Sequence, residues 1–306
     1  MPDVIALWSS HYSYTESILT FEEAGKTEPG NPASIVDLAR EHHLKQVVVA
    51  DARIDGFLEA YKNLSKPFKP TPPKPLADYV RDEQGDKKKP NEEDKIEAQK
   101  SLDKATAKYE REKLWSTEPI QLLYGVKMVV CADMTVKDEP SRRTESKVII
   151  FVKNTQGYSD LIKLYNRAWT DGFYYQGRLD WRLLKEFWTP NLMLALPFFS
   201  SFIKINTLSF SSIVPEFPCA PSEIWCLKEM DSGLPFAPLI EKALDEFANQ
   251  NGAQVQEVKS IYYAKPEDFM AYQTFRAIGE HGEYSAPNVS HLASDRFSFQ
   301  AWRELT

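Results

Sequence analysis

The chain has 306 residues, 42% of them hydrophobic, and a formal net charge of -7, so it can bury the core of one large domain or two smaller ones. The acidic balance argues against general coating of a polyanion such as DNA, and no apolar run reaches the roughly 18 residues that a membrane span needs. Three widely spaced cysteines predict reduced thiols rather than a disulfide framework, and we therefore expect a cytoplasmic protein with no membrane partner.

Short apolar runs alternate with amphipathic stretches along the chain. Strands are predicted over residues 4–8, 46–50, 120–131, 147–152, 191–196, 223–228 and 253–258. Helices are predicted over 32–43, 158–169 and 238–250, where apolar residues recur at helical spacing. Strands interleaved with helices predict an α/β fold around a mainly parallel sheet, either open or closed into a barrel.

Residues 65–114 depart from this pattern and are interpreted as an insertion. They begin with the proline-rich "KPFKPTPPKP", continue through the charge-dense "RDEQGDKKKPNEEDK" and end in a helical stretch with a thin apolar stripe. Two interpretations stay open, a solvated loop with a surface helix and a docking strip for a partner. The basic residues, with Phe68 and Tyr79 nearby, predict at most weak, salt-sensitive DNA binding, because acidic residues dilute their field.

The sequence contains none of the common motifs for nucleotide binding or acyl transfer. It has no glycine-rich phosphate loop, no Gly-x-Ser-x-Gly elbow and no Cys-x-x-Cys pair. A carboxylate does stand at the end of one predicted strand, where Asp51 follows "QVVVA" and the chain then continues into a helix. The carboxyl ends of strands are where α/β proteins bind metals and substrates, so this position is a candidate site.

The segment "GYSDLIKLYNRAWTDGFYYQGRLDWRLLKEF" (157–187) resembles, almost residue for residue, part of the PHP (polymerase and histidinol phosphatase) domain of the bacterial or phage C-family DNA polymerase III alpha subunit. Four further stretches resemble the family in the same order: "SHYSYTES" (10–17), "GFLEAY" (56–61), "EMDSGLP" (229–235) and "YYAKPEDFMAY" (262–272). The resemblance implies a distorted (β/α)7 barrel over residues 1–278, with 279–306 leading toward a polymerase body.

The resemblance also implies where a metal site would lie. Active family members hold up to three manganese, zinc or iron ions with His, Asp, Glu and Cys at the carboxyl edge of the barrel. Here those positions carry other residue types, apart from one carboxylate: Leu7, Ser9, Asp51, Ala52, Lys127, Phe198, Ser260 and Tyr262. Two or three dications need several anionic or imidazole ligands, so we expect a vestigial site with no metal, no cofactor and no catalytic residue.

A specific replacement for the lost metals follows from these positions. We expect Lys127 to supply positive charge and to form an ion pair with Asp51, while Leu7, Phe198 and Tyr262 fill the vacated volume. The alternative is that Asp51 and Lys127 are two unrelated surface charges.

Three functions remain open at this point. The resemblance implies a non-catalytic module that serves structure and partner docking in DNA replication, against a polymerase body in cis and as the seat of a separate proofreading exonuclease. A free-standing phage pseudoenzyme that binds replisome components is an alternative. A second alternative is a metal-dependent phosphoesterase or exonuclease with rearranged ligands, which would use Asp51 with His11 and with Glu16 or Asp55.

Overall fold

The structure is a computed structural model that describes residues 4–78, 92–283, 285–286 and 289–306. Its strands close into a seven-stranded barrel, whose wall is formed in order by β1 (Ile5–Trp8), β2 (Gln46–Asp51), β3 (Gln121–Cys131), β4 (Ser146–Val152), β6 (Leu192–Leu196), β7 (Trp225–Glu229) and β8 (Gln254–Ile261). The pairing of β8 with β1 closes the ring. The predicted barrel class is therefore confirmed.

The barrel is distorted by one reversed strand. β4 runs antiparallel to both of its neighbours, β3 and β6, whereas the other pairings of the wall are parallel. A short additional strand, β5 (Arg178–Asp180), extends the sheet beside the end of β3. The reversal matters for the site, because it brings the beginning of β4 to the mouth where its neighbours end.

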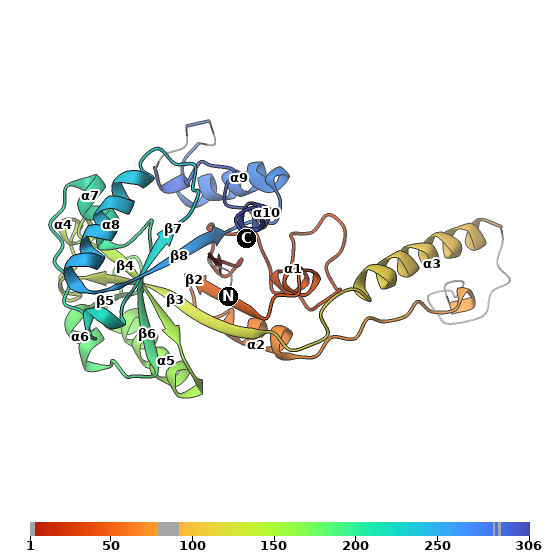
Figure 1. The fold of residues 1–306 in the computed structure, drawn as a ribbon, viewed down its shortest axis with the longest axis horizontal. Coiled ribbons are helices and arrows are strands. Elements are labelled where there is room, and N and C mark those ends of the chain that lie inside the picture. The colour runs from red at the N-terminus through yellow and green to blue at the C-terminus, as the bar shows by residue number, and fades with distance from the viewer. Residues whose placement is uncertain (1–3, 79–91, 284, 287–288) are drawn as a thin grey trace.

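Helices surround the barrel (Figure 1). They are α1 (Ile35–Glu41), α2 (Phe57–Ser65), α4 (Glu139–Arg142), α5 (Thr155–Thr170), α6 (Trp181–Glu186), α7 (Phe202–Ser209), α8 (Ala237–Asn251), α9 (Phe269–Gly279) and α10 (Phe299–Arg303). Single 3₁₀ turns lie at Leu76–Asp78, Pro221–Glu223, Pro266–Asp268 and Val289–His291. Within the described residues, no helix combines the length and apolar character needed to cross a membrane.

Local sequence signals set several helix ends. The side chains of Ser34 and Asn154 cap α1 and α5 by accepting backbone N–H bonds from Val36 and Gly157. α8 begins with a proline in its first turn and ends at Gly252, whose φ of 69° is the left-handed conformation that glycine adopts without strain.

Alternate residues of each strand face the inside of the barrel. The inward residues form an apolar cluster of their own: Leu7, Val48, Ala50, Ile149, Phe151, Ala195, Leu227 and Val258. The residues between them, such as Trp8, Val47 and Val49, belong to the main core that packs beneath the helices. The barrel is thus filled by side chains, and the polar chemistry gathers at its mouth.

The predicted insertion leaves the barrel as an arm. Figure 1 shows α3 (Glu92–Glu112) projecting to one side, away from the barrel. At the base of the arm, the buried Arg40 guanidinium donates hydrogen bonds to the carbonyls of Lys66, Ser116 and Glu118. The centre of the charge-dense stretch and Tyr79 lie outside the described residues.

The end of the chain packs on the barrel itself. The Phe299 ring stacks on that of Trp8 at 5.1 Å between centroids, and Trp302 Nε1 donates to the carbonyl of Val4 at 2.9 Å. Phe297 is fully buried in the same core. The segment 279–306, which we expected to lead toward a polymerase body, thus contributes Phe297, Phe299 and Trp302 to the core of the barrel domain.

Candidate functional site

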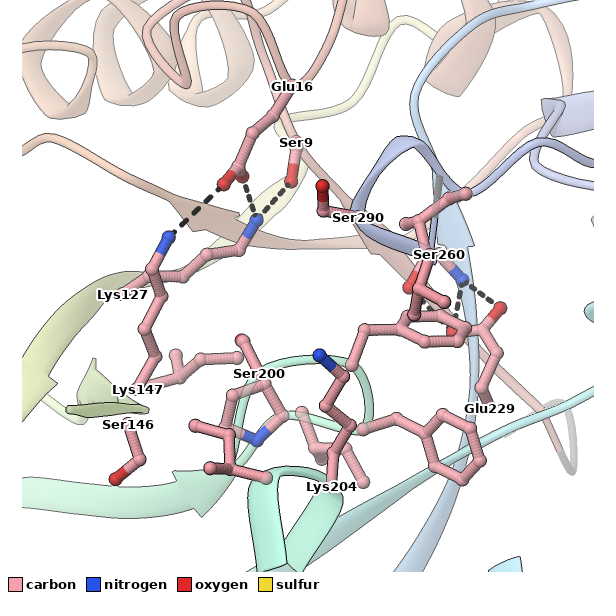
Figure 2. Close-up of a pocket in the computed structure, with 18 of the residues that line it drawn as sticks. Ser9, Glu16, Lys127, Ser146, Lys147, Ser200, Lys204, Glu229, Ser260 and Ser290 are labelled. Carbon is pink, nitrogen blue, oxygen red and sulfur yellow. Dashed lines mark hydrogen bonds and ion pairs between the residues drawn. The ribbon is translucent and has the colours of Figure 1, made fainter. Parts of the chain in front are cut away.

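The carboxyl ends of the parallel strands surround a cavity of about 590 Å³ (Figure 2). Because side chains alternate along a strand, residues that follow an inward-facing position by two residues can reach this mouth. This rule places four polar residues there: Ser9, Lys127, Glu229 and Ser260. Lys147 reaches the same mouth because it precedes the inward Ile149 by two positions on the reversed strand β4.

One wall of the cavity is held together by an ion-pair cluster. Lys127 Nζ lies 2.5 Å from Glu16 Oε2 and 3.1 Å from Ser9 Oγ, and Lys147 Nζ lies 3.5 Å from the other oxygen of Glu16. Burial alone would raise the pKa of Glu16, but the charges of Lys127 and Lys147 and the hydrogen bond from Lys127 hold this pKa well below its ordinary range. Glu16 is therefore ionised and neutralises one of the two lysines.

The opposite wall contains a second buried carboxyl group. Glu229 accepts hydrogen bonds from the backbone N–H of Ser260 at 3.0 Å and from its hydroxyl at 2.6 Å. Lys259 Nζ lies 3.8 Å from Glu229, and neither side chain is exposed to solvent. Burial raises the pKa of Glu229 to about 7 despite the opposing effects of Lys259 and Ser260, so this group exchanges a proton near neutral pH.

Asp51 is not part of the mouth, which corrects the predicted ion pair with Lys127. Its Oδ1 accepts from Ser10 N at 2.7 Å and Ser13 Oγ at 2.9 Å, and its Oδ2 accepts from Ser10 Oγ at 2.8 Å and Tyr124 Oη at 3.1 Å. The physical reason is strand parity, because Asp51 pairs with the outward Val126 and Lys127 is the next residue, on the other face.

Burial raises the pKa of Asp51, and the charge of Lys127 lowers it only as a lesser effect behind the bonds from Ser10 and Ser13. The carboxylate therefore anchors the loop that follows β1 to the end of β2, and Lys127 takes Glu16 as its partner instead.

The other positions of the expected vestigial metal site divide into those that line the cavity and one that does not. Leu7, Phe198 and Tyr262 are 8%, 3% and 8% exposed, and they line the cavity together with Ser9, Lys127 and Ser260. They narrow the mouth without filling it. Ala52 is not among the lining residues, and its backbone N–H donates to Ser13 Oγ.

The alternative set of metal ligands does not come together. His11 is exposed, lies beside the tilted ring of Tyr12 and has Nδ1 3.3 Å from the carbonyl of Leu19. Asp55 pairs on the surface with Arg53 at 2.7 Å. Among the described residues, no group of three His, Cys, Asp or Glu side chains is placed to hold a metal ion. The mouth therefore does not fit the metals that active PHP domains use, since ammonium groups stand beside its carboxylates.

Sequence reasoning missed Lys147 and Lys204 as residues of the mouth. Lys204 belongs to α7, and Figure 2 shows its ammonium group directed into the cavity between the two walls. Burial lowers the pKa of Lys204, and no carboxylate of the described residues forms a salt bridge with it. A lysine within the otherwise apolar stretch "SFIKI" was the available signal.

A closed α/β barrel whose polar residues gather at the carboxyl ends of its strands has the architecture of a barrel-type binding or catalytic domain. Comparison with known proteins narrows this class. The PHP domain family matches residues 29–206, which is more than half of the chain. The chain therefore belongs to the PHP domain family.

Two curated relatives are alpha subunits of DNA polymerase III. The protein from Thermus aquaticus is 23% identical over 163 residues, which cover 51% of this chain and 13% of the relative. The protein from Treponema pallidum (strain Nichols) is 23% identical over 203 residues, which cover 63% of this chain and 17% of the relative. The matched region thus spans less than a fifth of either relative.

Proposed function

We propose that this chain is a non-catalytic PHP module of a DNA polymerase III alpha-type protein, bacterial or phage, that serves structure and partner docking in DNA replication. The observation that carries the proposal is the position of the Lys127 ammonium group, which occupies the barrel mouth and is bonded to Glu16 and Ser9. The similarity to two alpha subunits supports the replication context.

Electrostatics explains why this arrangement opposes metal catalysis. A dication in the mouth would meet the ammonium groups of Lys127 and Lys147, and the carboxylate of Glu16 is already neutralised by them. The second carboxyl group, Glu229, lies beside buried Lys259 and has a raised pKa, so part of its population is uncharged near neutral pH. Neither group therefore offers the excess negative charge that several dications require.

The docking part of the proposal is supported by the closed barrel and by the similarity of the chain to two DNA polymerase III alpha subunits. Its candidate partners are a polymerase body in cis, replisome proteins and a proofreading exonuclease. The same docking role would serve a free-standing phage protein that binds replisome components. The exposed arm around α3 adds surface for such contacts.

Metal content and hydrolytic activity test the non-catalytic part. The purified chain is dialysed, assayed for bound manganese, zinc and iron, and incubated with a phosphate monoester and with 3′-labelled DNA in the presence of added manganese. We expect less than stoichiometric metal and no activity above buffer. Stoichiometric metal, together with activity that Asp51→Ala abolishes, would establish the rearranged enzyme instead.

Docking is tested separately by mixing the purified chain with a DNA polymerase III alpha body that lacks its own PHP region, encoded in the same genome. Size-exclusion chromatography with light scattering is expected to show a stable one-to-one complex. The same experiment with a proofreading exonuclease tests the other candidate. Failure of both partners to bind would refute the docking role and leave the metal result unaffected.

A further inference from the structure

We infer that a second cavity, at the base of the arm, is a docking site for an extended, carboxylate-rich peptide segment of a partner protein. This inference rests on the proposed docking function and adds the place and the chemistry of the partner segment. Three features of the cavity carry it: an excess of positive charge, a strip of backbone with unused carbonyl groups, and buried polar atoms that lack hydrogen-bond partners.

The arm-base cavity has a volume of about 600 Å³ and is lined by both the barrel domain and the arm. Its lining comes from the loop around Gly25, from Arg40 of α1, from the proline-rich strip (residues 66–74) and from the second half of α3. These parts are tied together, because Lys108 Nζ donates to the carbonyl of Gly25, and Gly25 N donates to Asp37 at 2.8 Å. The cavity is therefore a defined feature of the place where the arm joins the barrel domain.

Positive charge dominates this lining. Its cations are Lys26, Arg40, Lys66, Lys69, Lys74 and Lys108. Two carboxylates share the lining and have partners there, since Glu23 lies 3.9 Å from Lys66 and Glu112 lies 3.7 Å from Lys108. Lys26 and Lys69 are exposed, and neither forms a salt bridge within the described part of the chain. Even if Lys74 is left out of the count and Arg40 is set against the neighbouring Asp37, these two lysines leave an excess of about two positive charges, which favours an anionic occupant.

The proline-rich strip offers acceptors for a peptide backbone. Figure 1 shows the strip, in orange, running outward along the arm without helix or strand. It is fixed at its beginning, where Phe68 N donates to the carbonyl of Thr117 at 2.9 Å. Beyond that point, the carbonyl groups of Lys69, Thr71 and Pro72 accept no hydrogen bond from the described residues. An extended peptide laid along the strip can donate its N–H groups to these carbonyls, which is a common mode of peptide recognition.

Two buried residues of the lining each hold a polar atom without a hydrogen-bond partner among the described residues: Arg40 Nε and Glu112 Oε1. The Glu112 side chain is only 5% exposed, and its distance of 3.7 Å from Lys108 is too long for a hydrogen bond. Burial raises the pKa of Glu112, because the charges of Lys108 and Arg111 do not fully replace the lost water. Buried polar groups are normally hydrogen-bonded, and a peptide group has both a C=O to offer Arg40 and an N–H to offer Glu112.

These features favour a peptide over a nucleic acid. A phosphodiester backbone has acceptors but no donors, so it would leave both Glu112 and the carbonyl groups of the strip unpaired. The positive charge is also local, because the first turn of α3 carries Glu92, Glu93 and Asp94 and the whole chain has a net charge of -7. A short anionic segment matches such a confined field better than a long polyanion does.

Fluorescence anisotropy with the full chain at constant ionic strength tests this inference. The probes are a labelled octapeptide of alternating aspartate and alanine, the same peptide with asparagine in place of aspartate, and a labelled thymidine dodecamer. We expect saturable binding of the aspartate peptide, no saturable binding of the asparagine peptide over the same range, and weaker binding of the dodecamer. If the dodecamer binds as tightly as the aspartate peptide or more tightly, the surface is one for nucleic acid and the peptide assignment is wrong.

A double variant tests whether the cavity is the binding site. Replacing both Lys26→Gln and Lys69→Gln removes the two lysines without salt bridges and should weaken binding of the aspartate peptide about tenfold. The matched control replaces Lys137→Gln and Lys242→Gln, which are exposed lysines outside the cavity, so the net charge changes equally while the affinity should stay the same. The first double variant is expected to fold, because Lys26 and Lys69 are exposed and have no salt bridge to lose.

The possible outcomes separate this inference from the proposed function. Absence of saturable binding of the aspartate peptide refutes the inference, as do equal losses of affinity in the two double variants. A dimer of the chain that the Lys26 and Lys69 replacements dissociate, measured by light scattering, would make a second copy the occupant and refute a separate partner. Peptide binding without a stable complex with the polymerase body or the exonuclease supports the site and refutes those two partners. A stable complex without peptide binding refutes the inference alone.

Discussion

The buried carboxylate of Asp51 gives the sharpest test of the site assignment. If Asp51 anchors the loop after β1, its replacement should affect stability, and the effect should depend on how many hydrogen bonds the new side chain retains. Asp51→Ala removes the acceptor for all four bonds from Ser10, Ser13 and Tyr124. At a net value of about 1 kcal/mol for each bond, we expect a loss of about 4 kcal/mol in the free energy of unfolding.

Asp51→Asn should cost much less, about 1–2 kcal/mol. Its carbonyl oxygen can take the place of Oδ1, which accepts from Ser10 N and Ser13 Oγ, and its amide then faces two hydroxyl groups that can rotate to accept. The neutral amide also avoids the cost of burying a negative charge, which is the cost that raises the pKa of Asp51. The order of stability is therefore expected to be Asp, Asn and then Ala.

Urea denaturation followed by tryptophan fluorescence measures these differences. The control is Asp55→Asn, because Asp55 is 47% exposed and its surface ion pair with Arg53 contributes at most about 1 kcal/mol. Equal losses for Asp51→Asn and Asp51→Ala, or a loss below about 1 kcal/mol for Asp51→Ala, would show that the hydrogen-bond reasoning is wrong.

Three further predictions concern the barrel and its mouth. Gly125→Ala should cost about 1–3 kcal/mol, because its Cβ would lie 2.6 Å from the Phe151 ring, and an unchanged melting temperature would contradict this. Burial raises the pKa of Glu229 from 4.5 to about 7, so the folded state favours the protonated carboxyl group. The stability that this group contributes is therefore fully present below the ordinary carboxyl pKa and is lost as the pH rises through about 7. Glu229→Gln cannot ionise, so it should gain stability relative to the natural chain as the pH rises. The difference in free energy of unfolding, variant minus natural chain, should increase by on the order of 3 kcal/mol from about pH 5 to pH 8. A constant difference would refute the raised pKa of Glu229. Lys127→Met should raise the depressed pKa of Glu16 by removing its nearest ammonium group, which a carbon-13 carboxyl titration measures. No change in that pKa would mean that Lys147 alone depresses it.

The barrel strands could be predicted from the sequence because each is a short apolar run bounded by polar residues. The predicted strands at 46–50, 147–152 and 191–196 correspond to β2, β4 and β6 within one residue at each end. β5 was not predicted because a strand of three residues is too short to show an alternation of apolar and polar side chains. α7 was not predicted because its sequence, "FIKINTLS", lacks a clear polar face.

The contacts between residues of the mouth were harder to predict from the sequence, because they depend on which face of its strand each residue occupies. β2 is buried on both faces, so its sequence does not show that Ala50 points inward and Asp51 outward. The register between β2 and β3 supplies that information, and it separates Asp51 from Lys127 although both stand at the same end of the barrel. Glu16 lies in a loop, where no periodicity links it to β3.

The position of the mouth residues explains how this fold accommodates lysines at the carboxyl end of its barrel. The interior cluster ends with residues such as Leu7, Leu227 and Val258, and the mouth residues lie two positions further along their strands. A change at the mouth therefore alters electrostatics without opening a void in the packed interior. Stability then requires only that the new charges find partners, as Lys127 and Lys147 both do in Glu16.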